Sequence, residues 1–140
     1  MMSRCTDRSV STRRLHFLRV VPDGIPADVK AHAQWVVWRL VSREGRCTKV
    51  PFDPGTLRPA RTNDPRTWTS FERALARYDK CGMDGIGFVF TRHDPYAGFD
   101  LDGCRDAESG DIAPWASEIL ELVCSYAEVS PSGTGVKIIV

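Results

Sequence analysis

The sequence has none of the patterns that mark a membrane protein, a disulfide-rich secreted domain or a zinc protein. No apolar run approaches the roughly 20 residues that cross a bilayer, and no signal-peptide core follows the basic N-terminus. The five cysteines are odd in number and scattered, with no C-x-x-C pair, at positions 5, 47, 81, 104 and 124. That usage fits a reducing compartment. We therefore expect a cytoplasmic protein without membrane contact.

An excess of one charge is also missing. The chain has 19 Lys and Arg against 18 Asp and Glu, for a net charge of +1. Whole-molecule electrostatics therefore do not point to nucleic acid, and any basic surface must be local. The three histidines show no metal-ligand spacing, and no Ser/His/Asp arrangement can be assigned. The length of 140 residues suits one domain around one core.

The hydrophobic patterns predict an α/β fold of the α+β kind, with helices packed on a mixed or antiparallel sheet. Residues 1–22 are expected to be a disordered or mis-assigned tail, and residues 23–140 the domain. The stretch 34–41 is rich in β-branched and aromatic residues, as in a strand covered on both faces. Further strands are expected at 47–52, 85–90, 97–102 and after Gly135.

Turn and cap residues predict where these elements begin and end. Gly45 favours a hairpin turn between the first two strands. Thr69-Ser-Phe-Glu72 is typical of a capping box with Thr69 as N-cap, and Gly82 should end that helix. Pro114 should open a second helix. We expect the strand at 97–102 to pair back on the strand at 85–90 as a hairpin.

The strand at 97–102 delivers two carboxylates, Asp100 and Asp102, two residues apart. Alternate residues of a strand point to the same face, so both would lie close together. Oxygen ligands of this kind suit Mg²⁺ or Mn²⁺, which would bring substrate phosphates with it. The plainer alternative is a strand that ends in an acidic turn, since Asp-Gly is common turn chemistry.

A second candidate is the glycine-rich turn from Ser130 to Gly135, followed by an apolar strand that carries Lys137. Successive backbone N–H groups in such a turn can form an anion-binding nest, to which hydroxyls add donors. A plain flexible hairpin turn is the alternative. The candidate nucleotide-binding residues are Ser130, Ser132, Gly133, Thr134, Gly135 and Lys137.

Other metal sites fit less well. The run from Asp100 to Asp106 differs from a calcium loop because its glycine comes at the fourth position and Cys104 stands where a ligand is needed. A lone Asp-x-Asp also occurs in sugar-nucleotide transferases, so by itself it indicates only a metal–phosphate site.

Several segments occur together in an order that resembles a known family: QWVVWRL, TKVPFDP, NDPRTWTSFERALARY, DGIGFVF, DPYAGFDLDGCRD and SPSGTGVKIIV. From about Ile25 to Val140 they are similar to the front part of the bifunctional primase/polymerase domains of the archaeo-eukaryotic primase superfamily. Such domains occur in phage, plasmid and mobile-element replication proteins. The resemblance implies an RRM-related core in which Asp100 and Asp102 hold catalytic metals.

The same resemblance implies that the turn at 130–135 and Lys137 contact the triphosphate of the incoming nucleotide. Lys137 stands where the family usually has a histidine; it can bind phosphate as a point charge but cannot act as a near-neutral proton donor. The family's third motif, which supplies another Asp, is expected beyond Val140. We therefore interpret the chain as a fragment with little or no polymerase activity of its own.

The functional hypothesis is a fragment of a DNA primase/polymerase that transfers nucleotides with two Mg²⁺ or Mn²⁺ ions. Its partners would be nucleoside triphosphates and a single-stranded DNA template, with a helicase domain or protein in the parent. The alternatives are a non-catalytic nucleotide-binding or single-stranded nucleic-acid-binding remnant and, less favoured, a metal-dependent sugar-nucleotide transferase.

Overall fold

The structure is a computed structural model that describes residues 3–4 and 17–140, and it divides into two compact units. The N-terminal unit holds residues 3–4 and 20–89, and the C-terminal unit holds residues 17–19 and 90–140. Both combine antiparallel strands with helices, which confirms the expected α+β class. Most of the expected tail at 1–22 lies outside the described residues. None of the described helices is long and apolar enough to cross a membrane.

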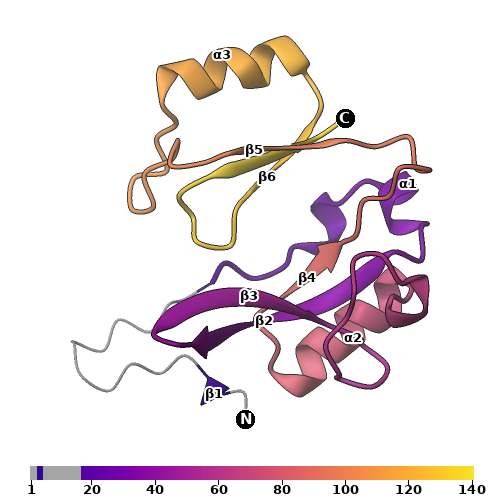
Figure 1. Cartoon of the computed structure of the whole chain (residues 1–140). Coiled ribbons are helices and arrows are strands. Elements are labelled where there is room, and N and C mark those ends of the chain that lie inside the picture. The colour runs from indigo at the N-terminus through magenta and orange to yellow at the C-terminus, as the bar shows by residue number, and fades with distance from the viewer. Residues whose placement is uncertain (1–2, 5–16) are drawn as a thin grey trace. The chain divides into compact units, whose positions relative to one another are not determined.

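The N-terminal unit is built around one long strand, β2, which pairs with three others. β3 runs along one side of it, while β4 and β1 pair with its two ends (Figure 1). The elements of this unit are β1 (Ser3–Arg4), η1 (Pro22–Gly24), α1 (Ala27–Lys30), β2 (Trp35–Arg43), β3 (Arg46–Phe52), η2 (Pro65–Thr67), α2 (Phe71–Cys81) and β4 (Gly85–Phe88).

A two-residue turn joins β2 to β3, as the sequence predicted. Glu44 and Gly45 both have positive φ, at 51° and 75°. This is the backbone of the hairpin turns that match the right-handed twist of the strands.

The core of the N-terminal unit uses both faces of β2. Residues 35–38 are all buried, which confirms a strand covered on both faces. On one face Val37 and Val41 pack with Phe52 and Met83, and α2 adds Tyr78 and Cys81 at the edge of the same cluster.

On the other face of β2, the ring of Trp38 lies against the backbone of β4. A Cβ atom on Gly85 would come within 2.5 Å of that ring, so only glycine fits there. The indole N–H of Trp38 donates to the Ile86 carbonyl at 3.1 Å. The glycines of this strand therefore allow a close neighbour, and for Gly85 that neighbour is a tryptophan.

The N-terminal cap of α2 lies one residue later than predicted. Thr69 exchanges two backbone hydrogen bonds with Trp35, so its backbone belongs to a β-bridge. Ser70 is the N-cap instead, and its hydroxyl accepts from the Arg73 N–H at 3.4 Å. The other end is as expected, since Gly82 ends α2 with a φ of 58°.

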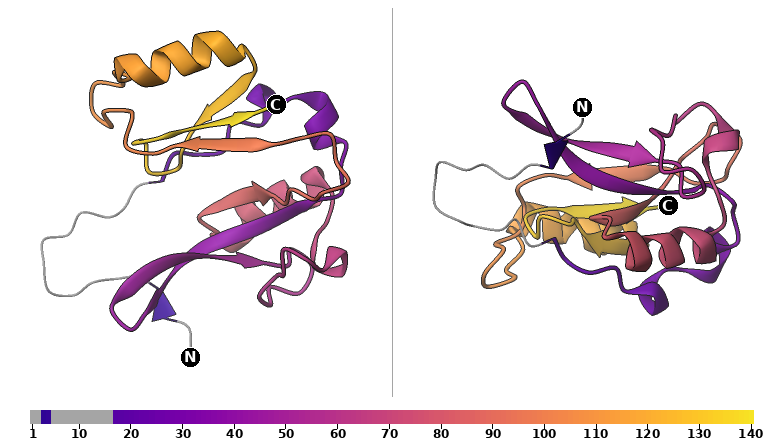
Figure 2. Two further views of the ribbon diagram at one scale, coloured as in Figure 1. Left: turned by 45° about the horizontal axis from the view of Figure 1, so that its top comes forward. Right: turned by 90° about the horizontal axis from the view of Figure 1, so that it is seen from below.

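The C-terminal unit is a three-stranded antiparallel sheet in the order β5-β7-β6 with one helix, α3 (Figures 1 and 2). Its buried cluster joins Cys104, Ala116 and Val136, with Leu101 and Leu120 packed against them. Helix α3 therefore covers the face of the sheet to which Leu101 and Val136 point. The elements are β5 (Gly98–Leu101), α3 (Pro114–Val123), β6 (Tyr126–Val129) and β7 (Val136–Ile139).

The prediction that the strands at 85–90 and 97–102 form a hairpin is wrong. β4 pairs with β2, and β5 pairs with β7. The connection turns at Thr91–Asp94, where the Asp94 carboxylate accepts from the Thr91 N–H at 2.9 Å. Strands that follow one another in the sequence do not always pair, and here each strand pairs with an apolar strand that is more distant in the chain.

Candidate functional site

Three charged residues stand in one row across the sheet of the C-terminal unit. Lys137 on the central strand β7 is directly opposite Asp100 of β5 and directly opposite Glu128 of β6. Residues that face each other in antiparallel strands share one face of the sheet. Asp100 alternates with Leu101, which packs toward α3, so the row lies on the face that α3 does not cover.

The first two members of the row form an ion pair. Lys137 Nζ lies 3.3 Å from Asp100 Oδ1, with the two side chains 35% and 61% exposed. The ammonium group also lies 5.9 Å from the centre of the Phe90 ring. Because both charged groups reach solvent, the pair is worth at most about 1 kcal/mol. A ligand could therefore separate the two side chains at small cost.

Asp102 lies just beyond this strand. β5 ends at Leu101, and Asp102 stands in the turn before Gly103, whose φ is 62°. Both Asp100 and Asp102 are exposed. The strand geometry expected for the pair therefore applies to Asp100, while Asp102 belongs to the acidic turn named above as the plainer alternative.

Exposed carboxylates suit a hard cation such as Mg²⁺ or Mn²⁺. Within the described part of the chain, however, no three His, Cys, Asp or Glu side chains come together to hold a metal ion. One of the two predicted ligands, Asp100, already has an ammonium partner. The donors therefore fit a contribution to one cation and do not by themselves make a two-metal centre.

The serine–glycine turn joins β6 to β7 and is closed by its own backbone. The Ser130 N–H donates to the Gly135 carbonyl at 2.9 Å, and the Gly133 N–H donates to the Ser130 carbonyl at 2.8 Å. The Gly135 N–H donates to the Ser130 hydroxyl at 3.0 Å. These three N–H groups point into the turn, so they do not form the open anion nest that we predicted.

Hydroxyl groups are what the turn presents instead. The Ser130 and Ser132 hydroxyls lie 3.0 Å apart, and those of Ser132 and Thr134 lie 2.9 Å apart. A hydroxyl hydrogen rotates to suit its partner, so such a chain can redirect its donors toward an anion. This arrangement supports the choice of Ser130, Ser132 and Thr134 as phosphate contacts.

Gly135 brings the two motifs into contact. A Cβ atom at this position would lie 2.9 Å from the Leu101 carbonyl oxygen and 3.7 Å from the Asp102 Cα. The turn can therefore approach the end of β5 only because residue 135 has no side chain. The acidic motif and the serine–glycine motif, 28 or more residues apart in the sequence, meet at this point.

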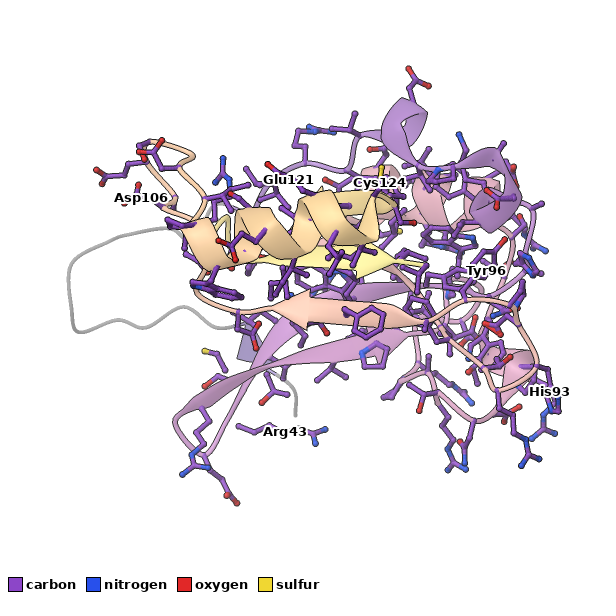
Figure 3. All side chains as sticks on the ribbon, turned by 90° about the horizontal axis from the view of Figure 1, so that it is seen from above. Arg43, His93, Tyr96, Asp106, Glu121 and Cys124 are labelled. Atoms are coloured by element: carbon purple, nitrogen blue, oxygen red, sulfur yellow. The ribbon has the colours of Figure 1, made fainter. Side chains whose placement is uncertain are left out.

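Arg105 was not among the site residues predicted from the sequence. Its backbone N–H donates to the Thr134 carbonyl at 3.0 Å, and its guanidinium donates to the Gly133 carbonyl at 2.8 Å. The loop that follows β5 therefore holds the serine–glycine turn in place. The next residue, Asp106, lies on this loop before α3 (Figure 3). The sequence feature that could have indicated Arg105 is a cationic residue three positions after Asp102.

Glu128 was also not predicted as a site residue, although the β6–β7 hairpin places it opposite Lys137. The turn at 130–135 sets the register, which puts Glu128 opposite Lys137. The Tyr126 hydroxyl donates to Glu128 Oε2 at 2.9 Å. Burial of the phenol, followed by the charge and the hydrogen bond of Glu128, raises the pKa of Tyr126 well above its ordinary value. This pair forms the far end of the charged row.

Comparison with known proteins identifies a homologous sequence. No protein-family model matches the chain. The DNA primase-polymerase of Nitratiruptor phage NrS-1 is 38% identical to it over 119 residues, which cover 83% of this chain and 16% of that protein. The chain is homologous to part of a phage DNA primase-polymerase. The resemblance inferred from the motifs is thereby confirmed.

The homology covers a small share of the phage primase-polymerase, so it does not assign that protein's activity to this chain. Asp100 and Lys137 form a pair, and Gly135 abuts Asp102. Metal binding and nucleotide binding by these residues stay predictions.

Proposed function

We propose that the chain is the nucleotide-binding front part of a primase-polymerase that acts in phage-type or plasmid-type DNA replication. The observation that carries the proposal is the meeting of the two motifs at Gly135, beside the ion pair of Lys137 and Asp100. The homology to a phage DNA primase-polymerase supports the same reaction class.

In this proposal the incoming nucleotide lies with its phosphates over the serine–glycine turn. The hydroxyls of Ser130, Ser132 and Thr134 donate to phosphate oxygens, and Arg105 keeps the turn in position through the Gly133 carbonyl. Lys137 turns from Asp100 to the phosphates and neutralises part of their charge.

Departure of Lys137 leaves the Asp100 carboxylate free to bind a cation together with Asp102. Mg²⁺ or Mn²⁺ at these carboxylates would activate a primer 3′-hydroxyl and stabilise the charge of the transferred phosphoryl group. A complete centre requires a further ligand besides these two. We expect weak metal binding and little nucleotide transfer from residues 1–140 alone.

The test is calorimetric titration of dATP and ATP into the protein, with Mn²⁺ and with EDTA. Ser132→Ala should weaken binding in both media by several-fold, since it removes one donor worth about 1 kcal/mol. Asp100→Asn should abolish only the part of the affinity that depends on Mn²⁺. Ser109→Ala, another loop serine of the same unit, serves as the control and should leave both values unchanged.

A non-catalytic binding remnant is the second candidate, and the Lys137–Asp100 pair favours it because it occupies a predicted metal ligand. Nucleotide or DNA binding that is indifferent to EDTA and to Asp102→Asn would support this candidate against the first. Selective binding of a sugar-nucleotide over dATP would instead support a transferase. If Ser132→Ala leaves the affinities for both dATP and ATP unchanged, the proposed site is contradicted.

A further inference from the structure

A second charged feature lies on the N-terminal unit, outside the site described above. Three cations of α2 line a cavity of about 250 Å³ together with the loop that follows β3. None of its lining residues, all within the described chain, is acidic. They are Pro54, Gly55, Thr69, Arg73, Ala76, Arg77 and Lys80.

The three cations share one side of α2. Arg73, Arg77 and Lys80 are spaced by four and three residues, which places them on the same face of the helix. With a rise of 1.5 Å per residue the row is about 10 Å long. That is longer than a single phosphate group, so the row suits a run of phosphates.

The middle cation is fixed, and the outer two reach solvent. Arg77 Nε donates to the Pro54 carbonyl at 2.6 Å, and its Nη2 donates to the Gly55 carbonyl at 3.4 Å. These contacts hold the loop against α2 and form the wall of the cavity. Arg73 and Lys80 are exposed on either side of it.

The charge of the whole unit points the same way. Residues 20–89 carry 11 Lys and Arg against 8 Asp and Glu, whereas residues 90–140 carry 3 against 9. A net charge of +1 for the chain therefore hides two segments of opposite sign. A polyanion is attracted to the first segment and repelled by the second.

We propose that the cavity beside α2 binds the phosphodiester backbone of single-stranded DNA. Arg73 and Lys80 contact successive phosphates, and the exposed Ala76 supplies apolar contact for the sugars between them. The choice of DNA as the polyanion rests on the proposed function. The cation row and the cavity are independent of it.

Salt-dependent binding of a fluorescein-labelled oligothymidine of about 20 nucleotides, which exceeds the usual site sizes, tests the proposal. Each phosphate neutralised on a single strand contributes about −0.7 to the slope of log K against log salt. Arg73→Gln with Lys80→Gln should therefore make the slope less steep by about 1.4. The affinity should fall roughly 25-fold at 0.1 M salt and little near 1 M.

The matched control removes two cations elsewhere in the same unit. Arg43 and Arg46 stand opposite each other at the end of the β2–β3 hairpin, where Figure 3 labels Arg43. Arg43→Gln with Arg46→Gln makes the same change in net charge and should leave the slope within about 0.3 of the parent value, a fraction of one phosphate contact. Circular dichroism of both pairs verifies that the fold is retained.

An unchanged slope in the α2 variant would overturn the proposal, as would an equal loss in the hairpin variant. Competition by inorganic tripolyphosphate as effective as that by the oligonucleotide would also overturn it, because the site would then recognise a small anion. The α2 variant should keep its affinity for dATP. If Lys137→Met leaves dATP binding intact while the α2 variant loses its slope, the proposed function fails and the cavity site stands.

Discussion

The N-terminal unit buries Trp35 and Trp38 on the two faces of a single strand, whereas the C-terminal unit leaves Trp115 and Leu122 of α3 48% and 86% exposed. One long strand with three partners gives the first unit a core on both sides. The second has short strands with one helix on one face, and its other face carries the row of charged side chains.

The two units also differ in the sign of their net charge. The basic unit offers a row of cations beside a cavity, and the acidic unit offers hydroxyls, one lysine and several carboxylates. Phosphate can bind the first through direct charge pairing. In the second it must approach carboxylates, which requires Lys137 or a bound cation to offset their charge. Under the two proposals, DNA and nucleotide therefore bind to different units.

The largest expected effect is a loss of stability that is confined to the C-terminal unit. Ile138, on β7, is 1% exposed, so Ile138→Ala should lower the free energy of unfolding of the C-terminal unit by about 2–5 kcal/mol. Nucleotide binding should be lost while the salt slope for oligothymidine is retained. Leu122→Ala, at an exposed site, should stay within about 0.5 kcal/mol of the parent in a urea melt. Simultaneous loss of both ligands would show that the units do not act separately.

Replacement of Lys137 should change two affinities in opposite directions. Lys137→Met should weaken dATP binding by about 10- to 100-fold, because a charged donor to phosphate is lost at 1.5–3 kcal/mol. The same change should strengthen Mn²⁺ binding without nucleotide by up to about fivefold, because Asp100 loses its ammonium partner. Electron paramagnetic resonance of free Mn²⁺ measures the second quantity.

Lys49 provides the matched control for that experiment. It is also a strand lysine above an aromatic ring, with its ammonium 4.8 Å from the centre of the Trp38 ring. Lys49→Met should change neither affinity. Parallel losses of both ligands in Lys137→Met would contradict the exchange of partners at Asp100.

Close packing in the N-terminal unit makes Gly85 sensitive. Gly85→Ala would force a Cβ atom to within 2.5 Å of the Trp38 ring and should cost about 1–3 kcal/mol of unfolding free energy. Gly24→Ala, where the nearest heavy atom would be 3.9 Å away, should cost much less. Equal midpoints for the two variants in denaturant would contradict this packing.

Arg105 should act through the serine–glycine turn. Arg105→Met removes the hydrogen bond to the Gly133 carbonyl and should weaken dATP binding by about threefold to tenfold, an effect of about 1 kcal/mol. Arg92→Met, an exposed arginine of the same unit, is the control. A loss that is equal in the two variants would indicate net charge and not positioning of the turn.

The smallest effect concerns proton binding by Tyr126. The unfolded chain releases this proton near pH 10, and the folded protein releases it only at higher pH. The contribution to stability is therefore present below pH 10 and is lost as the pH rises further. Glu128→Gln should lower the pKa part of the way, since burial remains, as measured by phenolate absorbance. Glu118→Gln should leave that titration unchanged.

Local patterns were sufficient where one residue type has one physical role. Gly45 predicted its turn and Gly82 its helix end, because few residues adopt positive φ easily. The apolar run at 34–41 predicted a strand buried on both faces, since exposure of either face would leave aromatic rings in water. The order of the motifs likewise predicted the relation to primase-polymerases.

Pairing was the part that local patterns could not predict. β4 and β5 are adjacent in sequence yet belong to different sheets, because strand partners are chosen by apolar faces across the fold and not by proximity in the chain. The N-cap is Ser70 and not Thr69 for a similar reason, because the backbone N–H and carbonyl of Thr69 are hydrogen-bonded to Trp35.

The residue types needed for phosphate and metal chemistry, and the class of fold that holds them, were determined by the sequence alone. The tertiary structure decided which of them lie next to one another. Register across β7 put Asp100 and Glu128 on either side of Lys137, and the missing side chain of Gly135 let the turn reach Asp102. Contacts between distant segments depend on strand pairing and close approach, and neither is encoded in any single stretch of the chain.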